Sequence, residues 1–107
     1  MSAIPLTGAG RSSPSAGPTA EFSATPTSGS GPLSVDFTDL STGTPTSWYW
    51  EKNDGLTGWV EFVGGGVNEP NPTEEFSFGT WSVRLTVTNL AGSDTETKTN
   101  YIQSIAE

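Results

Sequence analysis

The sequence predicts an all-β protein, and three observations lead to that prediction. In the stretch 81–88 every second residue is apolar, which places one buried strand face on Trp81, Val83, Leu85 and Val87. Similar short runs recur along the chain and are separated by clusters of Gly, Pro, Asn, Asp and Ser. No segment carries apolar residues at the 3.6-residue period of a helix. We therefore expect a β-sandwich of about seven or eight strands.

The first half of the chain predicts four strands, at 20–26, 33–38, 47–52 and 58–63. Apolar residues two positions apart mark the buried faces of the first three, which carry Phe22 and Ala24, then Leu33, Val35 and Phe37, then Trp48 and Trp50. The segments 27–32 and 39–45 are predicted turns. Asn53, Asp54 and Gly55 form a further turn, because these residue types tolerate positive φ.

The second half predicts a loop, two clear strands and a polar final strand. Three glycines at 64–66 end the fourth strand, and two prolines in 68–72 predict a loop. Strands follow at 73–78, with Phe76 and Phe78 on one face, and at 81–88. After a turn at 91–94, the last strand, 95–105, begins with alternating threonines and charges. The sequence favours a solvated edge whose charges Asp94, Glu96 and Lys98 deter edge-to-edge association. The alternative is an edge that receives a strand from another chain.

Composition limits both the size and the chemistry of the protein. The 107 residues suit one domain, predicted at 19–107. The chain has no cysteine and no histidine, so disulfides, thiol chemistry, the usual zinc sites and an imidazole base are excluded. A net charge of −8 opposes binding to nucleic acid or to an anionic membrane. No apolar run approaches the roughly 20 residues that cross a bilayer.

Residues 1–18 are rich in Gly, Ser, Ala and Pro and are predicted to form an N-terminal arm. Two interpretations are open: a disordered tail, or a segment that orders when it binds a neighbour. In the second interpretation Ile4, Pro5 and Leu6 anchor the arm, and Arg11 is its only basic residue. Because the chain opens with Met and lacks the basic-then-apolar order of a secretory signal, we expect synthesis in a host cytoplasm.

Several segments in order resemble polycystic-kidney-disease (PKD) domains, an immunoglobulin-like family used for adhesion and spacing. The resemblance covers nearly all of 19–107. Residues 22–29 with 31–39 are similar to the family's opening two strands, and 46–50 to its central tryptophan strand. Residues 71–73, 79–83 and 89–99 are similar to its later strands and turns. The resemblance implies an immunoglobulin-like sandwich without catalytic chemistry.

The chain departs from the PKD pattern just after the tryptophan strand. The family's Asp-Phe-Gly-Asp-Gly stands here as Glu51, Lys52, Asn53, Asp54 and Gly55, so only the last two positions match. Lys52 replaces a buried aromatic residue, and we expect the strand near 59–63 to cover the resulting gap. The stretch from residue 55 to residue 71 is also longer than is typical of the family.

Acidic residues offer two candidate sites. Asp54, with Glu51 and Asp39 as neighbours, could hold a calcium ion, whereas the alternative is that Asp54 caps its own turn, and the sequence favours the cap. Glu74 and Glu75, or Glu61 and Glu69, could form a glycosidase carboxylate pair. Adjacent residues of a strand face opposite sides, so Glu74 and Glu75 cannot act together. We expect no enzyme, no cofactor and no resident metal.

The four tryptophans divide into core and surface candidates. Trp48, Trp50 and Trp81 lie in phase with or beside apolar strand residues, so core packing is favoured for at least two of them. Tyr49, between two tryptophans that share a face, is expected to point outward. Trp59 lies in the longer stretch. Tyr49 and Trp59 are therefore the predicted surface contacts for a partner, which could be a protein or a sugar.

These expectations favour a non-enzymatic structural protein. The first hypothesis is a bacteriophage capsid decoration or cement protein, or another virion surface protein, that binds the shell through its N-terminal arm. Its partner would be the capsid shell or copies of itself, with a homo-trimer as a guess from capsid symmetry. The alternative is an extracellular adhesion or polysaccharide-binding PKD module of a secreted bacterial or archaeal protein.

Overall fold

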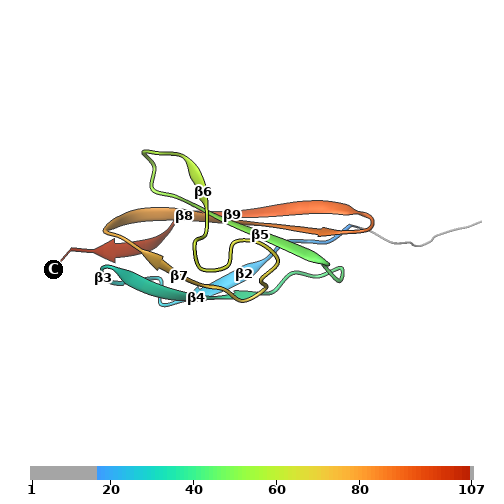
Figure 1. The fold of residues 1–107 in the computed structure, drawn as a ribbon, viewed down its shortest axis with the longest axis horizontal. Helices are drawn as coiled ribbons and strands as arrows, with labels where there is room; N and C mark the ends of the chain where they lie inside the picture. Colours follow the sequence, from blue (N-terminus) through green and yellow to red (C-terminus); the bar gives the residue numbers. More distant parts are fainter. Residues whose placement is uncertain (1–16, 107) are drawn as a thin grey trace, which may run out of the picture.

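The computed structural model describes residues 17–106, which form two β-sheets packed face to face (Figure 1). The smaller sheet has the order β2-β4-β7 and the larger sheet the order β3-β9-β8-β5-β6. The all-β prediction and the number of strands are confirmed. The strands are β2 (Phe22–Thr25), β3 (Ser28–Ser30), β4 (Leu33–Asp39), β5 (Ser47–Asn53), β6 (Trp59–Glu61), β7 (Thr73–Phe76), β8 (Gly79–Asn89) and β9 (Gly92–Ile105).

β4 is the central strand of the smaller sheet and pairs antiparallel with β2 and β7. Its alternating sequence buries Leu33, Val35 and Phe37, as predicted, and exposes the residues between them. On β2, Phe22 is buried and Ala24 packs against the core. The period of two therefore determines which face of this sheet meets the other sheet.

β8 is the central strand of the larger sheet and pairs antiparallel with β5 and β9. Its predicted inner face, Trp81, Val83, Leu85 and Val87, is buried. The register with β9 shifts between Trp81 and Val83, where Ser82 Oγ accepts a hydrogen bond from the amide of Asn100. Asn100 has a φ of 53°, so β9 bends here.

The prediction of a turn over 27–32 is wrong in its middle, where β3 forms. Ser28, Gly29 and Ser30 pair in parallel with Gln103, Ser104 and Ile105 of β9. These residue types have low strand propensity, so the pairing depends on the tertiary placement of the end of β9. The chain thus leaves the smaller sheet after β2 and joins the larger sheet before β4 begins.

Trp50, on the larger sheet, lies at the centre of the core and contacts rings of the smaller sheet and of the loop after β6. Its ring centre is 5.2 Å from Phe22, 5.3 Å from Phe37 and 5.7 Å from Phe62. Its indole N–H donates to the carbonyl of Glu69 at 2.7 Å. The predicted core role of Trp50 and Trp81 is confirmed, and Trp48 packs against the core while remaining partly exposed.

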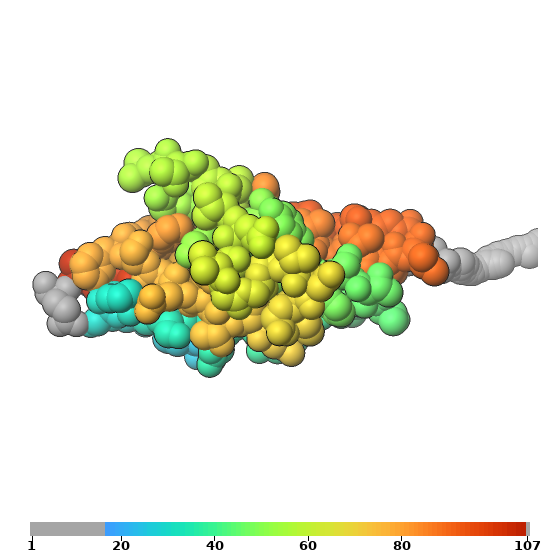
Figure 2. All heavy atoms as spheres, in the orientation of Figure 1, coloured from blue at the N-terminus to red at the C-terminus, as the bar shows by residue number. Residues whose placement is uncertain are grey.

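Two predicted strands are shorter than expected. The strand predicted at 73–78 ends at Phe76, which is buried, whereas Phe78 is 56% exposed. The strand predicted at 58–63 is reduced to Trp59–Glu61. Phe62 then turns inward and is 2% exposed. The segment after β6 crosses the side of the sandwich, where Figure 2 shows it in yellow.

The described chain enters the sandwich at one end and finishes at the other (Figure 1). Pro18 is buried, and Thr19 and Thr42 exchange two backbone hydrogen bonds of 3.1 and 3.0 Å. The amide of Ala20 donates to Asp94 Oδ2 at 2.8 Å. At the other end, the carbonyl of Ile105 accepts a hydrogen bond from Gly31. Residues 17 and 106 therefore lie near opposite ends of the long axis.

We expect Trp81→Ala to lower the free energy of unfolding by about 3–5 kcal/mol, because it leaves a cavity in the core. Urea denaturation followed by circular dichroism measures the change. Phe78→Ala is the matched control, since Phe78 is a nearby aromatic residue that is 56% exposed. Equal losses in the two variants would contradict the burial of Trp81.

Candidate functional site

The outer face of the larger sheet is polar on one side and aromatic on the other. On β8 and β9 it carries hydroxyl pairs: Thr86 Oγ1 lies 2.9 Å from Thr95 Oγ1, and Thr88 Oγ1 lies 2.7 Å from Ser93 Oγ. Toward β5 and β6, the same face carries Tyr49, Glu51, Trp59 and Arg84, which we call the arginine cluster. The alternation of β5 and β8 places these side chains on the same face.

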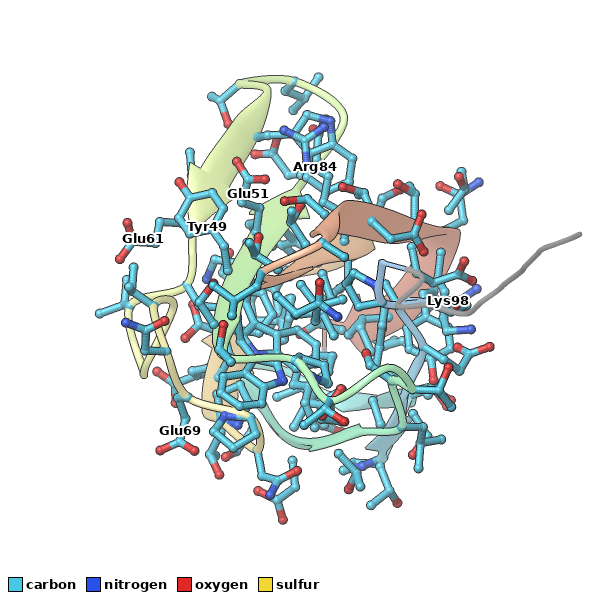
Figure 3. The ribbon with its side chains drawn as sticks, turned by 90° about the vertical axis from the view of Figure 1, so that its right-hand side faces the viewer. Tyr49, Glu51, Glu61, Glu69, Arg84 and Lys98 are labelled. Carbon is cyan, nitrogen blue, oxygen red and sulfur yellow. The ribbon has the colours of Figure 1, made fainter. Side chains whose placement is uncertain are left out.

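Arg84 connects Glu51 and Trp59 within the arginine cluster. Its Nε donates to Glu51 Oε1 at 2.6 Å, and its guanidinium carbon lies 4.3 Å from the centre of the Trp59 ring. Figure 3 shows Tyr49, Glu51 and Arg84 close together on one side of the sandwich. Glu51 lies directly opposite Arg84 on the neighbouring strand. The ion pair and the stacked indole hold the guanidinium in one orientation.

Tyr49 forms the exposed rim of the arginine cluster, as predicted from its position between two tryptophans. It is 38% exposed and pairs with Val67, which is 53% exposed, through a short antiparallel bridge. The loop after β6 continues this contact, since the amide of Asn68 donates to the carbonyl of Trp48 at 2.7 Å. A tyrosine, a tryptophan and an arginine in one patch are the residue types enriched at binding hot spots.

A second charged site lies between the sheets, at the position where the sequence departs from the PKD pattern. Lys52 Nζ lies 2.7 Å from Glu74 Oε2, and the two side chains are 12% and 2% exposed. The ammonium also donates to the carbonyl of Glu75 and lies 5.1 Å from the ring centres of Phe76 and Trp81. Lys52 therefore contributes its charge to a buried pair and its stem to the edge of the core.

Glu74 also fastens the longer stretch to the sandwich. Its carboxylate accepts hydrogen bonds from the amides of Val63 at 2.9 Å and Gly64 at 2.7 Å. These bonds position Phe62, whose ring lies 5.1 Å from Phe37 and 6.0 Å from Phe76. Phe62 is the buried side chain of this stretch, and that the stretch covers a gap left by Lys52 stays a prediction. The Lys52–Glu74 pair is thus a structural site.

The other candidate carboxylates do not converge. Asp54 Oδ1 accepts hydrogen bonds from the amides of Leu56 and Thr57. These two bonds lower the pKa of Asp54, and the bond from Thr57 has the larger effect. Asp39 Oδ1 accepts from the amide of Ser41, and Glu51 is paired with Arg84. Asp54 therefore caps its own turn, and these three residues do not assemble a calcium site.

The proposed glycosidase pairs are not assembled either. Glu74 is buried while Glu75 is exposed, which confirms that they face opposite sides of β7. Both Glu61 and Glu69 are exposed, and Figure 3 shows them at separate positions on the surface of the sandwich. Glu69 is engaged locally, since its Oε1 accepts from the amide of Asn71 at 3.2 Å.

The structure places two of the predicted partner-binding residues, Tyr49 and Trp59, on the same face of the larger sheet, and Trp59 stacks on Arg84. Ile4, Pro5, Leu6 and Arg11 lie outside the described residues. Sequence reasoning did not identify Lys52 and Glu74 as a pair. One signal was present, because Glu74 occupies the same strand phase as the buried Phe76.

Comparisons with known proteins leave the family open. No protein-family model matches the chain, and a search of curated proteins found no match. Between residues 17 and 106, no three His, Cys, Asp or Glu side chains are grouped so that they could hold a metal ion. The same part of the chain contains no helix that is long and apolar enough to cross a membrane.

We expect Glu74→Gln to lower the free energy of unfolding by about 3 kcal/mol or more, because it leaves the Lys52 ammonium without its buried counter-charge. Chemical denaturation at neutral pH measures the loss. Glu75→Gln is the control, and as an exposed substitution it should change stability by less than about 0.5 kcal/mol. A loss in Glu74→Gln as small as that in Glu75→Gln would contradict this expectation, and it would mean that the Lys52 ammonium turns to solvent when Glu74 is replaced.

We expect Trp59→Ala to lower the free energy of unfolding by about 0.5–1 kcal/mol, since it removes a partly exposed cation–π contact while the core remains intact. Differential scanning calorimetry measures the change. Leu56→Ala in the same hairpin is the control, because Leu56 is 89% exposed. A loss as large as that of Trp81→Ala would show that Trp59 belongs to the core.

Proposed function

We propose that this chain is a non-enzymatic, PKD-like structural module that decorates a capsid or another virion surface and attaches through the residues that precede Gly17. The observation that supports the proposal best is the way in which the chain joins the sandwich. Its entry is fastened at one end of the long axis, and the last described residue lies near the other end (Figure 1). A module built in this way projects outward from its point of attachment.

The entry of the chain is fastened to the sandwich by one buried ring and three hydrogen bonds. Pro18 is buried, Thr19 and Thr42 exchange two backbone bonds, and the amide of Ala20 is bonded to Asp94. These contacts join the segment before β2 to β9, which carries Asp94, and to the loop between β4 and β5, which carries Thr42. Tension applied at Gly17 would therefore act on β9 as well as on the segment that leads into β2.

The charged groups of the described chain also favour a structural role. Glu51, Asp54 and Glu74 each accept hydrogen bonds that hold a strand pair, a turn or a loop. A carboxylate engaged in this way is poorly placed to exchange protons with a substrate. Binding without turnover is the function that these side chains support.

The alternative, a polysaccharide-binding or adhesion module, is favoured by one observation. Tyr49 is exposed on the same face of the sheet as the stacked Arg84 and Trp59, and a row of threonine hydroxyls continues along that face. Aromatic rings next to hydroxyls and a fixed guanidinium suit a sugar chain as well as a protein. Retention of the protein by insoluble cellulose or chitin, lost in Tyr49→Ala, would support this alternative.

The capsid proposal is tested by deleting residues 1–16 and keeping the buried Pro18. We expect the sandwich to unfold at an unchanged temperature, whereas cosedimentation with purified virus particles should fall at least tenfold. Exchange of Ile4 and Leu6 for Ser in the full chain is a second variant that keeps the length constant. Unchanged particle binding by both variants would refute attachment through this segment.

A further inference from the structure

β9 has a long unpaired edge. On one side it pairs with β8 along almost its whole length, whereas on the other side β3 covers only Gln103, Ser104 and Ile105. Among residues 17–106, no strand pairs with the outer edge of β9 from Gly92 to Ile102. The bend at Asn100 limits the straight part of this edge to residues 93–99. An edge of this kind is a template for a further strand.

The charged side chains of this strand are held on its inner face. Lys98 Nζ lies 2.9 Å from Glu21 Oε1 and 3.4 Å from Glu96 Oε2. Asp94 Oδ2 accepts a hydrogen bond from the amide of Ala20. Hydrogen bonding to Glu21 raises the pKa of Lys98, so its ammonium stays charged at neutral pH. The outer face carries the exposed threonines 95, 97 and 99. Inward charges on an edge strand deter pairing with a strand that does not match them, so a partner strand must carry complementary charges at these positions.

The sequence of this edge is complementary to itself. In an antiparallel pair, residues directly opposite one another point to the same face of the sheet. If two copies of β9 meet about a two-fold axis at Thr97, Glu96 of each copy lies opposite Lys98 of the other. Thr95 then lies opposite Thr99, and Thr97 lies opposite its own counterpart. Opposite charges would meet on the inner face and threonines on the outer face, and both combinations stabilise a strand pair.

The two neighbouring registers bring like charges together. An axis at Glu96 would place Asp94 opposite Lys98 but would also place the two Glu96 carboxylates opposite one another, and an axis at Lys98 would place two ammonium groups opposite one another. Like charges directly opposite destabilise a strand pair. An axis between two residues would pair an inward side chain with an outward one, which the pleat forbids. Thr97 is therefore the favoured centre.

We propose that two copies of this chain associate through the outer edges of β9, antiparallel and centred on Thr97, so that their larger sheets become one continuous sheet. The interface is isologous, with each copy giving the other the same residues. It goes beyond attachment to a capsid and does not depend on it, because purified protein alone supplies both partners. The contact is an edge rather than a broad surface, so the dimer forms in a concentration-dependent manner.

Sedimentation equilibrium of the full chain tests the proposal. With rising concentration up to the millimolar range, the mean mass should increase from 11.2 kDa toward twice that value. Thr97→Lys and Thr97→Glu each place like charges at the axis, and each should raise the dissociation constant at least tenfold. Thr38→Lys, the same change on an exposed position of β4, is the control and should leave the mass unchanged.

The decisive measurement is sedimentation equilibrium of an equimolar mixture of the Thr97→Lys and Thr97→Glu variants. A lysine opposite a glutamate restores attraction only if residue 97 meets residue 97, so the mixture should dimerise at least as well as the native chain. Because Arg84 lies opposite Thr97 within the chain, the unfolding temperature of each variant is measured to confirm folding. A native chain that stays at 11.2 kDa, a discrete trimer, or a folded mixture that stays monomeric would each overturn the proposal.

Discussion

The structure depends on the packing of aromatic rings between two small sheets, with Trp50 at the centre. Trp50 comes from the larger sheet, whereas Phe22 and Phe37 come from the smaller sheet and Phe62 from the loop after β6. Phe76 and Trp81 extend this packing, so six of the thirteen buried hydrophobic residues are aromatic. Aromatic pairs prefer particular relative orientations in addition to burying apolar area, so the rings also favour one placement of the two sheets over one another.

The cations of the described chain complete this core at its margins. Lys52 lies over Phe76 and Trp81, Arg84 over Trp59, and Lys98 over Phe22 and Tyr101. Each of the three also forms an ion pair, with Glu74, Glu51 and Glu21 respectively. In a protein with a net charge of −8, the scarce positive charges are therefore used where an aromatic surface would otherwise meet water.

These pairs differ in what they contribute. The Lys52–Glu74 pair is buried and holds the loop that carries Phe62, so loss of either partner leaves a charge in the core. The Lys98–Glu21 pair is more exposed and is screened by solvent. A hydrogen bond from Lys98 lowers the pKa of Glu21, so the contribution of Glu21 to stability is present above its unfolded pKa and is lost as the pH falls through the folded value.

The all-β class and the buried faces of β4, β5 and β8 follow from the sequence, because a period of two is a local property of a strand. The outward direction of Tyr49 and the turn cap at Asp54 follow from it as well. The strand at Ser28–Ser30 arises only in the folded chain, since its pairing depends on the distant end of β9. Folding likewise brings Lys52 to Glu74, and Arg84 to Trp59 and Glu51. These contacts join residues far apart in the chain, and local periodicity carries no information about which strands become neighbours.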